Sequence, residues 1–127
     1  MITLIIISLI FATLSGFCKA IMDLSEQSDL KFTPTVFWIK NQSWKNKWKG
    51  GLRKNGEKFW GSSRWFVALT DGWHLFGILF RVTFLTSFLC VGMLTCFSTW
   101  FYFGVLTNYV LFATSFHLFY NSKLLRK

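Results

Sequence analysis

Asp71 and His74 are the residues of this chain whose types and spacing best suit chemistry. Because they stand three positions apart, a helix would place them on one face, where their side chains can touch. A carboxylate beside an imidazole can serve acid–base catalysis, metal ligation or proton relay, and His117 could add a third group. We therefore treat Asp71, His74 and His117 as candidate catalytic residues. The structural alternative is that Asp71 caps or kinks the helix beside Gly72, while His74 pairs with it at the water boundary.

Two arginines flank this pair, and all four polar side chains fall within an arc of about 100° on a helical wheel. The pattern predicts an amphipathic helix over residues 64–81. This helix would either lie flat in the membrane interface or continue into the next crossing. In both positions, the planar guanidinium groups of Arg64 and Arg81 could clamp the phosphate of a lipid headgroup.

A second group of residues alternates tryptophan with lysine: Trp44, Lys45, Lys47, Trp48 and Lys49. If this segment is helical, the two tryptophans share one face with lysines beside them. Such a surface can stack bases and hold the phosphates of single-stranded nucleic acid. It suits a headgroup layer equally well, because Trp prefers that depth and each Lys gains about 1 kcal/mol from anionic lipid. Since apolar segments flank it on both sides, we predict binding to anionic lipid headgroups and not to nucleic acid.

The elements that must position these groups are apolar. No Asp, Glu, Lys or Arg occurs from Val82 to Tyr120, and 15% of the chain is charged, against about a quarter in globular proteins. A run of this length allows two crossings, since about twenty apolar residues suffice for one. We divide it near Gly104, with Asn108 as a second turn signal. Ile2–Cys18 supplies a third crossing as a retained anchor, the alternatives being a cleaved signal peptide or a lipoprotein signal.

These segments predict an all-α integral membrane protein with about three transmembrane helices and one amphipathic interfacial helix. Its expected parts are an N-terminal anchor (1–22), a basic, Trp-rich cytoplasmic loop (23–64), and a region (65–127) that holds the interfacial helix, a transmembrane hairpin and a basic tail. The net charge is +9, and Lys and Arg collect in the loop and the tail. The positive-inside rule therefore places the N-terminus outside and the C-terminus inside.

Three short motifs carry a resemblance to a known family: Ser43–Lys47 (SWKNK), Gly56–Ser63 (GEKFWGSS) and Thr70–His74 (TDGWH). They resemble an uncharacterised bacterial family of small polytopic membrane proteins. The resemblance extends over residues 43–74. It implies a location in the bacterial inner membrane and brings no activity with it.

The sequence favours an accessory or assembly subunit of a membrane complex, with the basic loop as its contact surface. Its expected partners are the lipid bilayer, other membrane proteins or further copies of the chain. It lacks a phosphate-binding loop, a Gly-x-Ser-x-Gly elbow and a His-Glu-x-x-His motif, so we expect no cofactor and no metal. Two alternatives use Asp71 and His74: an intramembrane enzyme acting on a lipid or prenyl substrate, and a proton or ion path through an oligomer.

Overall fold

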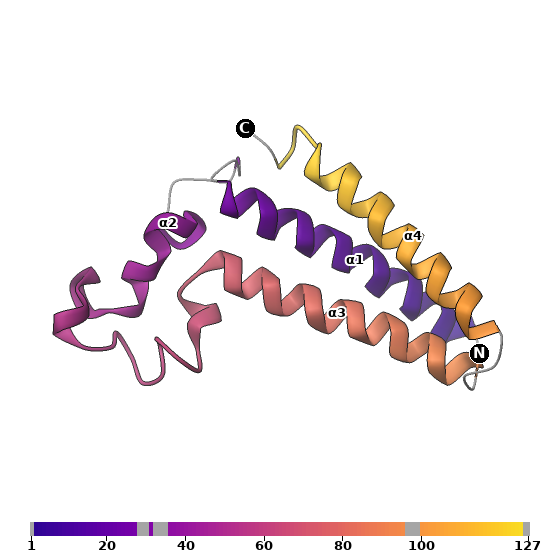
Figure 1. Ribbon diagram of the computed structural model, residues 1–127, viewed down its shortest axis with the longest axis horizontal. Coiled ribbons are helices and arrows are strands. Elements are labelled where there is room, and N and C mark those ends of the chain that lie inside the picture. The colour runs from indigo at the N-terminus through magenta and orange to yellow at the C-terminus, as the bar shows by residue number, and fades with distance from the viewer. Residues whose placement is uncertain (1, 28–30, 32–35, 96–99, 126–127) are drawn as a thin grey trace.

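The computed structural model describes residues 2–27, 31, 36–95 and 100–125, and within these ranges the chain is helical without a β-strand. Three long helices, α1 (Ile2–Glu26), α3 (Gly72–Thr95) and α4 (Trp100–Tyr120), form a bundle, as Figure 1 shows. Residues 36–71, which we call the loop region, lie beyond one end of this bundle. The all-α class predicted from the sequence is confirmed for the described residues. Besides α2 (Lys40–Ser43), the loop region contains short 3₁₀ helices at Val36–Trp38, Trp44–Lys47, Lys49–Gly51, Arg53–Asn55 and Val67–Leu69.

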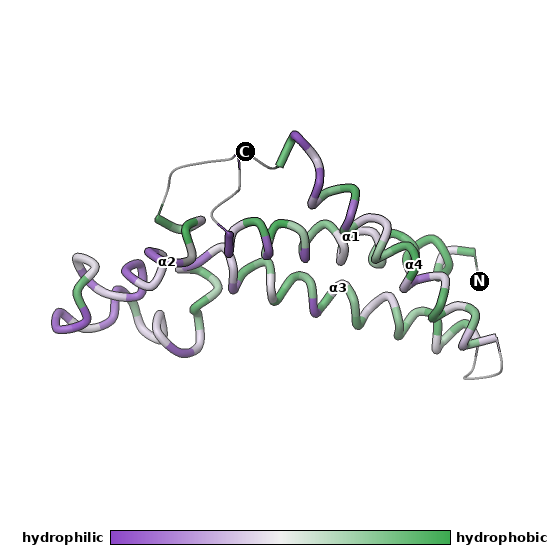
Figure 2. The backbone as a smooth tube through the Cα atoms, turned by 45° about the horizontal axis from the view of Figure 1, so that its top comes forward, coloured by the Kyte–Doolittle hydropathy of each residue, from purple (hydrophilic) through white to green (hydrophobic). Residues whose placement is uncertain are grey.

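Two helices, α1 and α3, are long and apolar enough to cross a membrane. Figure 2 shows the contrast in hydropathy between the bundle and the loop region. α1 continues beyond the expected boundary at residue 22, because Lys19 pairs with Asp23 one turn later (Nζ to Oδ1, 2.5 Å) and so supports the helix past its first charges. α4 also carries no Asp, Glu, Lys or Arg.

α1 lies between α3 and α4 and contacts both (Figure 1). Small residues recur at every fourth position on its buried side: Ser8, Ala12, Gly16 and Ala20. At Gly16 the helices are so close that an added Cβ would lie 1.8 Å from the Ser115 Oγ of α4. Small residues at this spacing let helix backbones approach closely, which explains why α1 takes the central place.

Gly104 does not form the turn between the last two helices. It lies inside α4, where an added Cβ would come 2.5 Å from a methyl carbon of Val91 in α3. The glycine therefore serves close helix packing, a common use of glycine in apolar helices. The connection falls instead within residues 96–99, outside the described residues.

The amphipathic helix predicted over residues 64–81 does not form as one element. Residues 64–71 make turns and a 3₁₀ helix, whereas Gly72–Thr95 is a single helix that includes Arg81. The start of this helix is set by Asp71, whose backbone O accepts from the Leu75 N–H at 3.1 Å. The polar stripe is thus divided between the loop region and the first turns of α3.

An apolar cluster closes the bundle at the end that carries the loop region. Its buried members are Ile21, Leu24 and Leu125. The segment after α4 packs back onto this end, because Lys31 N–H donates to the backbone O of Leu125 at 2.7 Å. The partly buried side chains packed against the cluster are Phe17, Trp38, Phe76, Phe119 and Tyr120.

Candidate functional site

The loop region has a fold of its own, built around an antiparallel pairing of Trp48 with Glu57. Next to this pair, Lys49 N–H donates to the backbone O of Gly56 at 3.1 Å. The chain reverses direction between them through glycines with positive φ, among them Gly50 (61°) and Gly56 (81°). Glycine adopts these conformations without a Cβ clash, so the sequence itself allows this compact reversal.

The helical face predicted for the tryptophans and lysines does not form. The 3₁₀ helix that begins at Trp44 ends at Lys47, and Trp48 is extended (φ −120°, ψ 146°). Pairing with Glu57 requires an extended residue at this position, and that long-range contact overrides the helical spacing. Three of the five predicted residues are exposed, namely Trp44, Lys45 and Lys49. The other two, Lys47 and Trp48, are partly buried.

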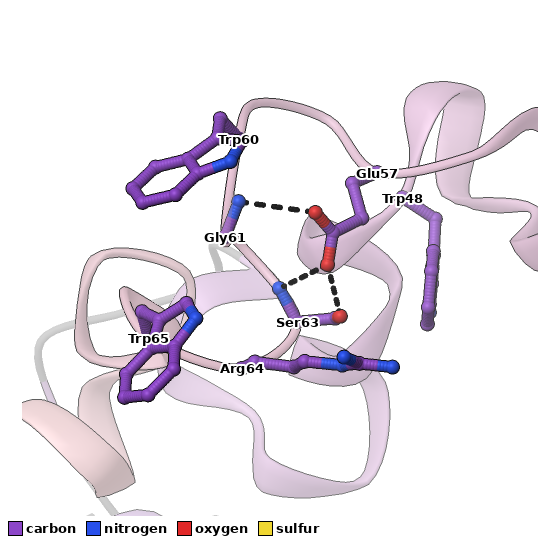
Figure 3. A pocket seen from close by; sticks show the side chains of 7 residues that line it. All are labelled: Trp48, Glu57, Trp60, Gly61, Ser63, Arg64 and Trp65. Carbon is purple, nitrogen blue, oxygen red and sulfur yellow. Dashed lines mark hydrogen bonds between the residues drawn. The ribbon is translucent and has the colours of Figure 1, made fainter.

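Glu57 holds the tight turn that follows the pairing. Its Oε2 accepts from the Gly61 backbone N–H (3.0 Å), while Oε1 accepts from the Ser63 backbone N–H (3.2 Å) and from the Ser63 hydroxyl (Figure 3). The Ser63 hydroxyl, followed by these backbone N–H groups and the charge of Arg64, lowers the pKa of Glu57 below its ordinary value. At neutral pH the carboxylate is therefore ionised and organises the turn.

Two tryptophans project from this turn. Trp60 and Trp65 are 78% and 77% exposed, and their indole rings border a cavity of about 420 Å³ whose lining also includes Arg64 (Figure 3). Indole rings beside a guanidinium group combine an apolar surface with a positive charge. This combination suits the boundary between water and lipid.

Hydrogen bonds from polar side chains hold the loop region together next to the start of α3. Asn46 Nδ2 donates to the backbone O of Thr70 (2.9 Å), and the Ser62 hydroxyl donates to the backbone O of Lys47 (2.7 Å). Both Thr70 and Ser62 are buried. These bonds join parts of the loop region that are up to 24 positions apart in the chain, and so they fix its fold.

Asp71 is the N-cap of α3. Its Oδ1 accepts from the His74 backbone N–H at 3.1 Å, and its Oδ2 lies 2.7 Å from His74 Nδ1. The two side chains touch, as their spacing predicts. The side chain of Asp71 is only 5% exposed, so both carboxylate oxygens are used within the protein. This arrangement is that of a capping residue which also orients an imidazole ring.

A second cavity, of about 270 Å³, brings together three of the candidate residues: Arg64, His74 and Arg81. His74 and Arg81 are seven positions apart in α3, which is about two turns, so they share one face. Arg64 reaches the same cavity because the loop region folds back beside α3. Trp65 and Trp73 complete the polar and aromatic part of the lining.

His117 lies outside this arrangement. It is exposed in the last turn of α4, where its ring packs edge-to-face against Phe116 (5.3 Å, 65°), and at this end of the bundle α1 lies between α4 and α3 (Figure 1). Within the described ranges, no three His, Cys, Asp or Glu side chains lie close enough to hold a metal ion. The catalytic role predicted for Asp71, His74 and His117 stays a prediction.

Asn108 links all three helices inside the bundle, a role that the sequence analysis missed by assigning it to a turn. Its Nδ2 lies 2.7 Å from the Ser8 Oγ of α1 and 2.9 Å from the Ser87 Oγ of α3. The Ser8 hydroxyl in turn donates to the Asn108 Oδ1 at 3.1 Å. The available signal was one amide in an uncharged helix, since polar groups in apolar helices usually face other helices.

Comparison of the chain with protein-family models, with curated proteins and with solved structures gave no match. The resemblance of the three sequence motifs to a bacterial membrane family therefore stays an expectation. Any function has to follow from the geometry of the bundle, the loop region and the two cavities.

Proposed function

We propose that the protein is an accessory or assembly subunit of a membrane complex, with three crossings and with the loop region as its contact surface. The observation that carries this proposal is the loop region itself. It is a folded unit with its own hydrogen bonds that presents exposed tryptophan and lysine side chains at one end of an apolar bundle. Such a surface is preorganised, so a partner would not have to order it on binding.

The distribution of side chains in the bundle supports membrane insertion. The interior holds small and polar residues such as Ser15, Ser87 and Asn108, whereas large apolar residues such as Leu85 and Leu106 are exposed. A water-soluble bundle buries its large apolar side chains. Hydrocarbon solvates them instead, and small residues then bring the helices together. We propose α4 as the third crossing beside α1 and α3.

The two basic segments lie at the same end of the bundle. The Tyr120 hydroxyl donates to Gln27 Oε1 at 2.9 Å, which joins the ends of α4 and α1. Two crossings, α3 and α4, separate the loop region from the C-terminal segment, so one membrane face can hold both. We propose that this is the cytoplasmic face of the bacterial inner membrane, and that α1 is retained because it is the helix between the other two.

Anionic headgroups are the proposed lipid partner of the loop region. Trp60 and Trp65 would lie at headgroup depth, with Trp44 nearby in the same unit. Each lysine close to an anionic surface contributes about 1 kcal/mol of attraction. At that depth the same tryptophan side chains would contact both the headgroups and the partner protein.

Catalysis is not part of this proposal. Both oxygens of Asp71 accept hydrogen bonds from His74, and His117 belongs to another helix end. The carboxylate caps α3 and fixes the His74 ring, which is what the structural alternative requires. The geometry therefore supports a structural role for Asp71.

Parallel purification in a mild detergent tests the proposal. The tagged wild-type protein is compared with a Trp60→Ala/Trp65→Ala double variant, and Trp100→Ala is the matched control because Trp100 is also exposed but begins α4 at the opposite end of the bundle. We expect a partner that co-purifies in fixed stoichiometry with the wild type and the control, and that is lost from the double variant. A photo-crosslinker at position 58 should join the same partner. A lone monomer in all three preparations would contradict an accessory role.

A further inference from the structure

We propose that the 270 Å³ cavity beside the start of α3 binds the phosphate group of an anionic phospholipid, whose acyl chain lies along α3. This inference rests on the proposed membrane location and adds a defined lipid site to it. The volume falls just below the roughly 300–1,000 Å³ of pockets that hold drug-sized molecules. It therefore fits a headgroup and not a whole lipid, which agrees with an acyl chain held outside the cavity.

The cavity brings two arginine side chains beside the ring of His74. Within the described part of the chain, neither Arg64 nor Arg81 forms an ion pair. The carboxylate of Glu57 attracts Arg64 electrostatically, but its oxygens accept hydrogen bonds from the turn that follows it. Asp71 holds the His74 ring through Nδ1, which leaves Nε2 available to a ligand. Phosphate oxygens suit these groups, because one guanidinium group can donate two parallel hydrogen bonds to two oxygens of the same phosphate.

Arg81 is the residue of the cavity for which a bound anion matters most. It lies about two and a half turns into α3, a helix apolar enough to cross a membrane, and its side chain is exposed. An arginine at that depth is costly unless its guanidinium group reaches water or an anion. A lipid phosphate at the level of the cavity provides that anion without requiring an acidic side chain.

Two indole rings set the depth of the site. Trp73 packs edge-to-face against His74 (ring centroids 4.9 Å apart, 84°), and its Nε1 donates to Glu26 Oε2 at the end of α1 at 3.3 Å. Trp65 lines the cavity from the loop region. Tryptophan prefers the headgroup level of a bilayer. The cavity between these rings thus lies where the phosphates of one leaflet are found.

An apolar stripe continues from the cavity along α3. Ile78 lines the cavity, and Val82, Leu85 and Leu89 follow it at spacings of four, three and four residues, all of them exposed. These spacings keep the side chains on one helix face. From Ile78 to Leu89 the helix rises about 16 Å, close to half of the roughly 30 Å hydrocarbon core. The stripe therefore matches the acyl chain of a lipid in one leaflet.

Native mass spectrometry of the purified full-length protein in detergent tests the site, with four probes titrated separately. Phosphatidylglycerol carries phosphate, charge and chains, and we expect it to bind about tenfold or more tightly than phosphatidylcholine, which is zwitterionic. Oleate has the negative charge and a chain without phosphate, and inorganic phosphate lacks the chain; we expect neither to bind in the same range. Equal binding of oleate or of inorganic phosphate would overturn the proposal.

Variants from two elements separate the site from general attraction to a basic protein. Arg81→Gln in α3 and Arg64→Gln in the loop region should each weaken phosphatidylglycerol binding about tenfold or more, since each removes a charge-assisted contact. Arg81→Lys keeps the charge but loses the planar guanidinium group. Its affinity for phosphatidylglycerol should therefore lie between that of the two glutamine variants and that of the wild type. The matched control is Lys54→Gln, an exposed loop lysine outside the cavity, which should bind like the wild type.

The outcomes distinguish this site from the accessory function. Equal weakening by Lys54→Gln and Arg81→Gln, at unchanged helix content, would overturn the lipid site while leaving the co-purification of a partner unaffected. If Arg81→Gln fails to fold, Arg64→Gln still tests the cavity, because Arg64 is an exposed residue outside α3. Loss of lipid binding with the partner retained would support the site and leave the accessory role standing.

Discussion

Asn108 and Glu57 organise two regions of the molecule in the same way but in different surroundings. Asn108 is 2% exposed and links three helices through side-chain hydrogen bonds. Glu57 lies at the surface of the loop region and gathers the N–H groups of one turn. Each residue satisfies several polar groups that would otherwise lack partners. Their difference is charge: the bundle uses a neutral amide and the loop region an ionised carboxylate.

The difference follows from the cost of desolvation. A carboxylate inside an apolar bundle would need a buried cation, because an unpaired charge there is strongly unfavourable. An amide has both donor and acceptor groups and can join hydroxyls on neighbouring helices without charge. At the loop surface water solvates the carboxylate, and its charge strengthens the hydrogen bonds that it accepts. The bundle should therefore respond to packing and the loop region to pH.

The largest effect is expected at the closest helix contact. Gly16→Ala would place a Cβ 1.8 Å from Ser115 Oγ and 2.6 Å from the backbone O of Phe112, and overpacking of this severity should cost about 3 kcal/mol or more. Thermal unfolding followed by circular dichroism in detergent measures it. Gly56→Ala is the matched loop substitution: it meets no atom within 4 Å but is strained at φ 81°. It should leave the melting temperature of the helices unchanged, and equal losses in both variants would break the comparison.

Loss of the Asn108 link should have the next largest effect. Asn108→Leu leaves the hydroxyls of Ser8 and Ser87 without their interhelical partner and should destabilise the bundle by about 1–2 kcal/mol, equally at pH 5 and pH 8. Thr107→Val is the control, since the Thr107 hydroxyl bonds only the Phe103 backbone O of its own helix (2.9 Å). Replacing both serines by alanine in the Asn108→Leu protein should restore part of the stability. If Asn108→Leu leaves the stability of the bundle unchanged, the Asn108 link does not contribute to it.

A smaller effect separates capping from chemistry at the start of α3. Asp71→Ala should cost about 1 kcal/mol, whereas Asp71→Asn should be nearly neutral, because asparagine is as good an N-cap as aspartate. Amide exchange at His74, whose N–H donates to Asp71, provides the local measurement beside thermal unfolding. An Asp71→Asn protein of normal stability that loses its cellular function would contradict the capping interpretation and favour an acid–base role.

The smallest effect is expected at Glu57 and depends on pH. Because hydrogen bonding lowers the pKa of Glu57 below the ordinary value of 4.5, its contribution to the turn is complete above that value and is lost as pH falls through the folded-state pKa. Amide exchange at Gly61 and Ser63 should therefore lose protection in acid. Glu57→Gln removes this pH dependence, and the bundle should show none in the same range. A wild-type turn insensitive to acid would contradict the role of the carboxylate.

The apolar pattern made the bundle predictable, whereas the contacts within it were not. Long uncharged runs permit few structures besides helices, so α1 and α3 follow directly from the sequence. Gly104 and Asn108 were misassigned to a turn, since glycine and asparagine signal turns in water but serve helix contacts in an apolar environment. Only the packing partner distinguishes the two uses, and that partner lies far away in the chain.

The residues of the candidate site were predicted more successfully than the secondary structure that positions them. The Asp71–His74 contact follows from local spacing alone. Arg64 lines the same cavity as His74 because of the fold of the loop region, which includes the Trp48–Glu57 pairing. In that pairing Trp48 is extended and not helical, and the residues around Trp48 do not predict this conformation.

The Asn108 link joins residues that are 100 positions apart in the chain, Ser8 and Asn108. During synthesis α1 leaves the ribosome well before α4 exists, so in the proposed membrane location its buried hydroxyls and small residues are present before their final neighbours. There, an incomplete chain would expose to lipid the polar groups that the complete bundle buries. The Asn108 link would thus distinguish a complete bundle from an incomplete one.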